Sequence, residues 1–371
     1  MLCVRKYIII GIILFILPSH ISSQNKLLIR EDLLAAANQV LSLTYNNEFN
    51  KAKELLVKIK KEIPDHPATP FLGALIIYWE FYPLTPENTN SESFIRLMEE
   101  TSSKAHSMVE KDEDDLEGIF FSLFSRAFYI MYWSDNGRPS KAFPFLNYLY
   151  KQTMKGIERK EEFVEFYFSS GLYKYYIEAY PEKYPIYKRI KFLFRQGNKK
   201  EGLEELAFCA ENAVYLRVEA RFFLSMIYLG YENNTLKAYE YAELLYNEFP
   251  NNPSYIENYA KTLLYKKDYA KAEIIINRLF EKNNTYCKLQ AHILNGYLLE
   301  KYKKNLTEAY NEYQKGEDLT GSYGQFATNY KALAWMGIGR YHKHKGNLSL
   351  AAKYFKMAKN ISPYGYIVDD K

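Results

Sequence analysis

Apolar residues recur along the chain with the spacing of a helix face. Two clear stripes are Leu203, Leu206, Ala207 and Ala210, and then Ile256, Tyr259, Ala260 and Leu263. Steps of three and four positions predict amphipathic helices. Since no convincing run alternates apolar and polar residues between turn signals, as half-buried strands do, the sequence predicts an all-α protein.

A small residue recurs near the start of alternate predicted helices. The positions are Ala52, Ala238, Ala272, Ala309 and Ala351. A small side chain there lets the two helices of a hairpin approach closely. Ala238 and Ala272 are 34 positions apart, which is the period of a tetratricopeptide repeat.

Proline and glycine mark the ends of these predicted hairpins. Pro64, Pro250 and Pro363 follow second helices, because proline cannot continue a helix interior. The spacing of Gly346 and Ala351 recurs in two weaker pairs, Gly197 with Gly202 and Gly137 with Ala142. In each pair the first residue is predicted to end a helix in the left-handed conformation.

The most specific motif spans residues 335–363. Trp335, Ile338, Gly339 and His342 are followed by Ala351, Phe355, Ala358 and Pro363. This series resembles the tetratricopeptide (TPR) pattern W-x-x-L-G-x-x-Y…A-x-x-x-F…P, with His342 in place of the usual Tyr. The resemblance implies a right-handed superhelical solenoid of TPR-type helical hairpins (an α-α superhelix), in which stacked neighbours bury one another's apolar faces.

A narrower resemblance involves the middle of the chain. It rests on Gly171-Leu172-Tyr173, Gly197 to Leu206, Arg217 to Leu224 and Phe249-Pro250-Asn251-Asn252-Pro253. This order is similar to exported bacterial TPR proteins of unassigned function. That resemblance implies a non-catalytic envelope scaffold.

We expect four segments. Residues 1–23 form a signal peptide, 24–67 an N-terminal TPR-like hairpin, 68–184 irregular helical hairpins and 185–371 a C-terminal TPR array. In the irregular part, Asp112 to Asp115 precede an apolar helix, Ile119–Trp133. These acids are interpreted as favouring the helix N-terminus, because their spacing lacks the pattern of a calcium loop.

The N-terminus has the features of a secretory signal. Arg5 and Lys6 precede the apolar run Tyr7–Leu17, and the small residues Ser22 and Ser23 follow. Cleavage near Ser23 is expected, which would make the protein periplasmic or secreted. The alternative is an uncleaved anchor, although the run is shorter than the roughly 20 residues that span a bilayer. No later segment is apolar enough to cross a membrane.

Composition narrows the function classes. The chain has 371 residues, 48% hydrophobic and 25% charged, with a net charge of +5. This is a globular composition without the concentrated basic face of a nucleic-acid-binding protein, so no nucleic-acid partner is expected. Cys209 and Cys287 are too few for a disulfide framework and are interpreted as small buried residues on helices, with one bridge between them as the alternative.

No catalytic or metal-binding motif is present. The sequence contains no H-E-x-x-H, G-x-S-x-G or P-loop signature. His342 and His344 are two positions apart on a predicted helix, so they cannot bind one metal ion as an i, i+4 pair would. We therefore expect no enzyme activity, no cofactor and no metal.

The resemblance to TPR arrays also indicates a binding groove. In such arrays, set positions of each first helix line the concave face and contact a protein or peptide partner. On this chain those positions are Phe223, Ile227, Tyr231, Glu257, Asn258, Lys261, Tyr265, Met336, Arg340, Lys343 and His344. The mixture of basic and aromatic side chains suits a carboxylate or an acidic peptide.

Two rival functions stay open. The Phe and Tyr residues between Phe120 and Tyr187 are numerous enough to line a cavity for a small or lipid-like ligand. An envelope enzyme with an unrecognised site is the other. The first hypothesis is an exported scaffold that binds a protein or peptide in its concave face.

Overall fold

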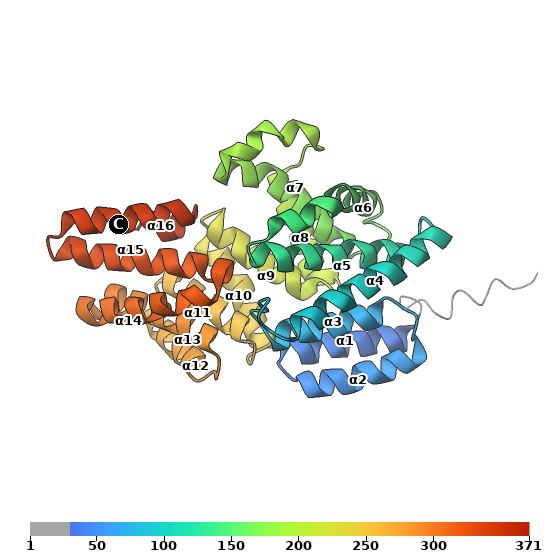
Figure 1. The fold of residues 1–371 in the computed structure, drawn as a ribbon, viewed down its shortest axis with the longest axis horizontal. Coiled ribbons are helices and arrows are strands. Elements are labelled where there is room, and N and C mark those ends of the chain that lie inside the picture. Colours follow the sequence, from blue (N-terminus) through green and yellow to red (C-terminus); the bar gives the residue numbers. More distant parts are fainter. Residues whose placement is uncertain (1–29, 371) are drawn as a thin grey trace, which may run out of the picture.

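The computed structural model describes residues 30–370, and every regular element in that range is helical (Figure 1). Consecutive helices pack as hairpins along the chain. The prediction of an all-α, right-handed superhelical solenoid of TPR-type hairpins is confirmed. The helices are α1 (Glu31–Tyr45), α2 (Phe49–Glu62), α3 (Ala68–Glu80), α4 (Ser91–Lys111), α5 (Leu116–Asp135), α6 (Leu146–Glu158), α7 (Phe166–Lys183), α8 (Lys199–Asn212), α9 (Arg217–Gly230), α10 (Thr235–Glu248), α11 (Pro253–Lys266), α12 (Tyr269–Phe280), α13 (Thr285–Leu298), α14 (Leu306–Asp318), α15 (Thr328–His344), α16 (Leu348–Ile361) and α17 (Gly365–Val368).

Short irregular helices interrupt this order. Five are 3-10 turns: η3 (Pro139–Phe145), η4 (Pro185–Arg189), η5 (Lys191–Leu193), η7 (Leu319–Ser322) and η8 (Gly324–Ala327). The sixth, η6 (Leu299–Lys303), is a π-helical turn that extends α13. Turns of the π type often occur at functional sites, and η6 carries a residue of the site described below.

The small residues of the predicted ladder lie at helix contacts. Ala52, Ala238, Ala272, Ala309 and Ala351 are each at most 2% exposed. The prolines also act as predicted, because α2, α10 and α16 each end two residues before Pro64, Pro250 and Pro363. Asp115 caps α5 by accepting a hydrogen bond from the amide of Gly118 at 2.8 Å, which confirms the capping interpretation.

The predicted role of Gly197 is wrong. Gly137 and Gly346 have φ of +70° and +82°, as a left-handed helix end requires, but Gly197 does not have a positive φ. A Cβ at Gly197 would instead lie 2.3 Å from the carbonyl oxygen of Lys174 on α7. Glycine is needed there for close approach to a backbone. The weaker copy at Ala142 also differs, since this residue lies in η3 and α6 begins four positions later.

The predicted segment boundaries fall between helical elements. The range 24–67 contains α1 and α2, and the range 68–184 ends just after α7. However, α7 packs closely on α8, where the carbonyl oxygen of Gly171 is 2.7 Å from a Cβ placed at Gly202. The boundaries therefore stay predictions.

The predicted signal, residues 1–23, lies outside the described residues. Among the helices of residues 30–370, none combines the length and the apolar composition of a membrane span.

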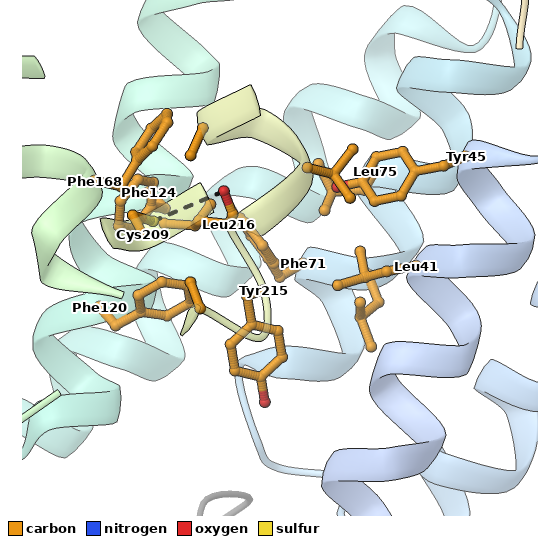
Figure 2. Close-up of a cluster of buried hydrophobic side chains, with 14 of the residues drawn as sticks. Leu41, Tyr45, Phe71, Leu75, Phe120, Phe124, Phe168, Cys209, Tyr215 and Leu216 are labelled. Atoms are coloured by element: carbon orange, nitrogen blue, oxygen red, sulfur yellow. Dashed lines mark hydrogen bonds between the residues drawn. The ribbon is translucent and has the colours of Figure 1, made fainter. Parts of the chain in front are cut away.

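Buried side chains form two clusters that meet in the middle of the solenoid. One extends from Leu33 to Tyr255 and the other from Ala242 to Val368. Figure 2 shows part of the first cluster, in which residues from α1, α3, α5, α7, α8 and the loop before α9 converge. The Cys209 thiol lies there, 3.9 Å from the Leu216 carbonyl oxygen. Both Cys209 and Cys287 are free and buried on helices, as predicted.

The superhelix curls tightly enough for its first hairpins to contact much later helices. Asn252 donates a hydrogen bond of 2.9 Å to the carbonyl oxygen of Tyr45, across 207 positions. The ring of Trp79 lies 5.7 Å from that of Tyr255, and the ring of Tyr82 lies 6.1 Å from that of Tyr286. The end of α3 therefore covers one side of the hollow formed by α9, α11 and α13.

A close helix contact in the C-terminal unit gives a stability test. A Cβ at Gly337 would lie 2.1 Å from the Tyr313 ring, which is itself buried. We expect Gly337→Ala to lower the free energy of unfolding by roughly 2 to 3 kcal/mol, as overpacking does. Gly321→Ala is the control, because no atom lies within 4 Å of its Cβ position. Denaturant unfolding of both variants checks this; equal stability of the two would contradict the packing account.

Candidate functional site

The C-terminal segment, residues 363–370, returns to the inner helices of the solenoid. The ring of Tyr364 lies 5.8 Å from that of Tyr231 at the end of α9. The ring of Tyr366 lies 5.0 Å from that of Tyr265 in α11, edge to face. Ile367 is 1% exposed. The segment thus lies against the first helices of successive hairpins, which form the concave face of a TPR array.

An ion-pair clamp holds the end of this segment. Arg340 of α15 donates to both carboxylate oxygens of Glu300 on η6, at 2.5 and 2.7 Å. A further guanidinium nitrogen of Arg340 donates to the carbonyl oxygen of Asp370 at 2.6 Å. The Lys301 ammonium lies 2.8 Å from the Asp370 carboxylate, and the Tyr313 hydroxyl donates to Glu300 at 2.8 Å. One buried guanidinium therefore fastens the C-terminal segment to the π-helical turn.

The electrostatics of the clamp favour charged Arg340. Burial alone would lower the pKa of this guanidinium, but the hydrogen bonds and charge of Glu300 outweigh burial and raise it. Both partners are nearly buried, Arg340 at 9% and Glu300 at 8% exposed. A buried, bidentate pair of this kind is strongly destabilised when one member is removed, because the other charge is left unpaired.

A cavity of about 150 Å³ lies beside the segment. Its walls come from the end of α3, the inner helices α9, α11, α13 and α15, the turn η8 and the C-terminal segment. The lining residues are Tyr82, Phe222, Met226, Ser254, Glu257, Lys261, Tyr286, Gln290, Phe326, Asn329, Tyr330, Leu333, Tyr366 and Ile367. The lining combines aromatic and polar side chains with a smaller number of aliphatic ones.

The polar groups of the cavity centre on α11. The Lys261 ammonium lies 3.0 Å from the Glu257 carboxylate, and both side chains are more than nine-tenths buried. Gln290 donates to the Tyr330 hydroxyl at 3.1 Å. Two further polar atoms of α11, Asn258 Oδ1 and the hydroxyl of Tyr265, are buried without a hydrogen-bond partner among the described residues. Buried polar atoms are nearly always paired, but neither residue lines the cavity.

The structure separates the predicted groove residues into four groups. Glu257 and Lys261 line the cavity, and Tyr231, Tyr265 and Arg340 contact or face the C-terminal segment. Lys343 and His344 are exposed at the end of α15, away from these contacts. The rest are buried and packed: Ile227, Asn258 and Met336 are fully buried, and Phe223 packs on Phe168. Whether any of them contacts a partner stays a prediction.

Sequence reasoning missed half of the site. It assumed an open groove, whereas the C-terminal segment lies against the inner helices and forms part of the cavity wall. Glu300, Tyr330 and Asp370 were not singled out, and neither was Tyr366. One signal was present: the apolar run Tyr364 to Val368 follows the proline that ends α16. An apolar tail after a terminal repeat must find a surface to cover, and the concave face was the available one.

The concave face offers aromatic side chains, the buried pair Glu257–Lys261 and the cationic clamp of Arg340. Among residues 30–370 no group of three or more His, Cys, Asp or Glu side chains is arranged to hold a metal ion. These features define the class as a TPR-type helical solenoid with an internally occupied concave face.

Comparisons with known proteins leave the identity of the chain open. No family model matches it, and no curated protein does. Among solved structures, the human IFIT1 dimer with PPP-AAAA is similar to it over 91% of this chain and 98% of that chain, at 13% identity and a TM-score of 0.39. A similarity this weak shows neither a shared family nor a shared ligand.

The clamp yields a test of its energetic role. We expect Arg340→Met to lower the free energy of unfolding by roughly 2 to 4 kcal/mol, because the buried Glu300 loses its bidentate partner and keeps only Lys301, at 3.6 Å, and the Tyr313 hydroxyl. Replacing both residues, Arg340→Met with Glu300→Met, is expected to recover much of that loss. Lys343→Met on the same helix is the control, since Lys343 is exposed. If the single variant unfolds like the control, the clamp contributes little.

Proposed function

We propose that this protein is an exported, non-catalytic TPR scaffold whose hollow binds an extended segment of a protein or peptide partner. The observation that supports this most is the C-terminal segment itself. Residues 363–370 lie against the inner helices through aromatic side chains, and Arg340 and Lys301 bind Asp370. A surface that accepts this segment has the shape and charge to accept a similar one from another chain.

The segment defines the expected chemistry of the partner. It combines tyrosines, branched apolar residues and two aspartates in the order Tyr364-Gly365-Tyr366-Ile367-Val368-Asp369-Asp370. A partner would present aromatic and aliphatic side chains followed by a carboxylate for the clamp. The C-terminal segment already occupies the proposed site, so a partner must displace it. The apparent affinity for the partner is therefore reduced by a factor equal to the fraction of molecules in which the segment has left the site.

Other parts of the proposal rest on the sequence. Export is supported by the signal-like N-terminus, Arg5 to Ser23. The absence of catalytic motifs supports a binding role. A nucleic-acid partner is disfavoured because the acidic groups Glu257 and Glu300 lie in the hollow beside the cations, and the net charge of +5 is small for 371 residues.

A peptide offered in trans tests the proposal. The probe is a fluorescein-labelled peptide of residues 363–371, and the proteins are the full chain and its Tyr366→Ala/Asp370→Ala variant. This variant weakens the internal segment, so we expect it to bind the peptide at least tenfold more tightly than the unaltered chain. Fluorescence anisotropy measures the affinity.

Two controls sharpen this comparison. Adding Lys301→Ala removes a cation that contacts Asp370 and should reduce peptide binding again, whereas Leu348→Ala, at an exposed position on α16, should leave it unchanged. A scrambled peptide should bind weakly to every variant. If the opened variant does not bind the native peptide, the hollow is a structural core and the proposal fails.

The aromatic cavity supports a second candidate, a site for a small ligand. Its volume of about 150 Å³ is below the usual 300–1,000 Å³ of ligand pockets. It therefore suits a small aromatic or aliphatic ligand that carries one polar group. The buried pair Glu257–Lys261 would bind that group. Native mass spectrometry of freshly purified protein is expected to show an added mass that Lys261→Met reduces; a bare chain mass would count against this candidate.

A further inference from the structure

The connection between α7 and α8 projects from the body of the solenoid. It comprises residues 183–195, called the finger here, and contains η4 and η5. Figure 1 shows it as the light-green segment standing beyond the stacked helices near the label of α7. At its base the finger adjoins the concave face, where the Lys183 ammonium lies 5.7 Å from the centre of the Tyr231 ring, and the rest of it projects from the stacked helices.

The base of the finger is fixed to its neighbours. Tyr173 of α7 donates a hydrogen bond of 2.6 Å to the carbonyl oxygen of Arg195, and the ring of Phe194 lies 5.6 Å from that of Tyr150 in α6. Near the other end, the ring of Tyr187 lies 5.0 Å from that of Tyr180. The finger is thus a supported structure with a defined orientation.

The tip of the finger is unusually apolar for an exposed segment. Phe192 is 81% exposed, Ile186 71% and Leu193 64%. Two more exposed apolar residues, Phe143 at 69% and Leu146 at 49%, precede Tyr150, the residue that supports the finger. Contiguous exposed apolar side chains of this kind mark interaction surfaces rather than ordinary protein surface.

Positive charges surround these apolar side chains. The charged residues of the finger are Lys183, Lys188, Arg189, Lys191 and Arg195, and the finger contains no Asp or Glu. Lys191 pairs with Glu178 at the base. Within residues 30–370, no salt bridge to an acidic side chain forms at Lys188, Arg189 or Arg195. Most of the positive charge is therefore available to an external partner.

We propose that the finger binds the surface of an anionic phospholipid bilayer. Phe192, Leu193 and Ile186 would enter the boundary between headgroups and acyl chains, and the lysines and arginines would contact the lipid phosphates. Basic residues flanking exposed aromatic and aliphatic ones are the composition of interfacial membrane anchors. A protein interface is favoured less, since lysine is depleted in the cores of such interfaces. This inference does not depend on what occupies the hollow.

Vesicle binding by the expected mature chain, residues 24–371, tests the inference. The probes are vesicles of phosphatidylcholine with and without phosphatidylglycerol, and sedimentation measures the ratio of bound to free protein. We expect binding to require phosphatidylglycerol and to weaken as salt is added. The paired changes Phe192→Asp/Leu193→Asp and Lys188→Glu/Arg189→Glu should each lower the ratio at least tenfold.

Matched controls separate the finger from general surface effects. Leu236→Asp and Ile274→Asp introduce the same charge at positions that are 61% and 64% exposed on α10 and α12, and should bind like the unaltered chain. Because the apolar stretch Tyr7–Leu17 can itself enter lipid, all proteins in this test begin at Gln24, the first residue after the expected cleavage. Circular dichroism checks that each variant is folded.

Hydrogen exchange provides a local readout. Amides of residues 184–195 should exchange more slowly when phosphatidylglycerol vesicles are present, while those of α12 should not change. The inference is overturned if finger variants sediment with vesicles as the unaltered chain does, or if the control variants lose binding equally. It is also overturned if the finger variants change self-association in ultracentrifugation and leave vesicle binding intact, because that result assigns the finger to a protein contact.

Discussion

Close approach between neighbouring helices is the constraint on which the whole structure depends. A hairpin of this size cannot cover its own apolar faces, so each one relies on the next. The contact is possible only where one helix presents almost no side chain: Ala238 and Ala272 are fully buried, and at Gly202 even a Cβ would lie 2.7 Å from the carbonyl oxygen of Gly171. Stacking these hairpins in one direction produces the curl, and the curl brings α3 against α13 and creates the hollow.

Local features of the fold could be predicted from the sequence, whereas contacts between distant segments could not. Pro64 and Pro250 end helices through an effect on their immediate neighbours in the chain. The 34-residue spacing can be recognised by comparing two adjacent repeats. The contact between Tyr82 and Tyr286 depends on the pitch of the whole superhelix, to which every hairpin contributes. Gly197 shows the same limit on a small scale. It precedes a small residue at the same spacing as Gly346 does, but glycine is needed at this position for close approach to the backbone of α7.

The candidate site follows this division. Rules for TPR arrays identified Lys261 and Arg340 as inward-facing, and both do lie in the hollow. The same rules indicated Asn258 and Met336, which are fully buried; Asn258 donates a hydrogen bond to Ser225 of the neighbouring α9. Those rules could not predict that the C-terminal segment lies against the concave face. They assign positions on the first helix of each repeat and do not apply to residues that follow the last repeat. The tyrosine-rich C-terminal segment is joined to the terminal hairpin by a short turn, so its effective concentration at the concave face is high. A separate molecule must compete with that effective concentration.

The position of Asp370 has a practical consequence for anyone who produces this protein. Its carbonyl oxygen accepts a hydrogen bond from Arg340, and its carboxylate lies beside Lys301. An affinity tag or fluorescent reporter fused after residue 371 would begin within two residues of this anchor. Such a fusion would disturb the contacts of the C-terminal segment and so change how the concave face binds. Recombinant labels are better inserted at exposed positions elsewhere, for example near Gly321.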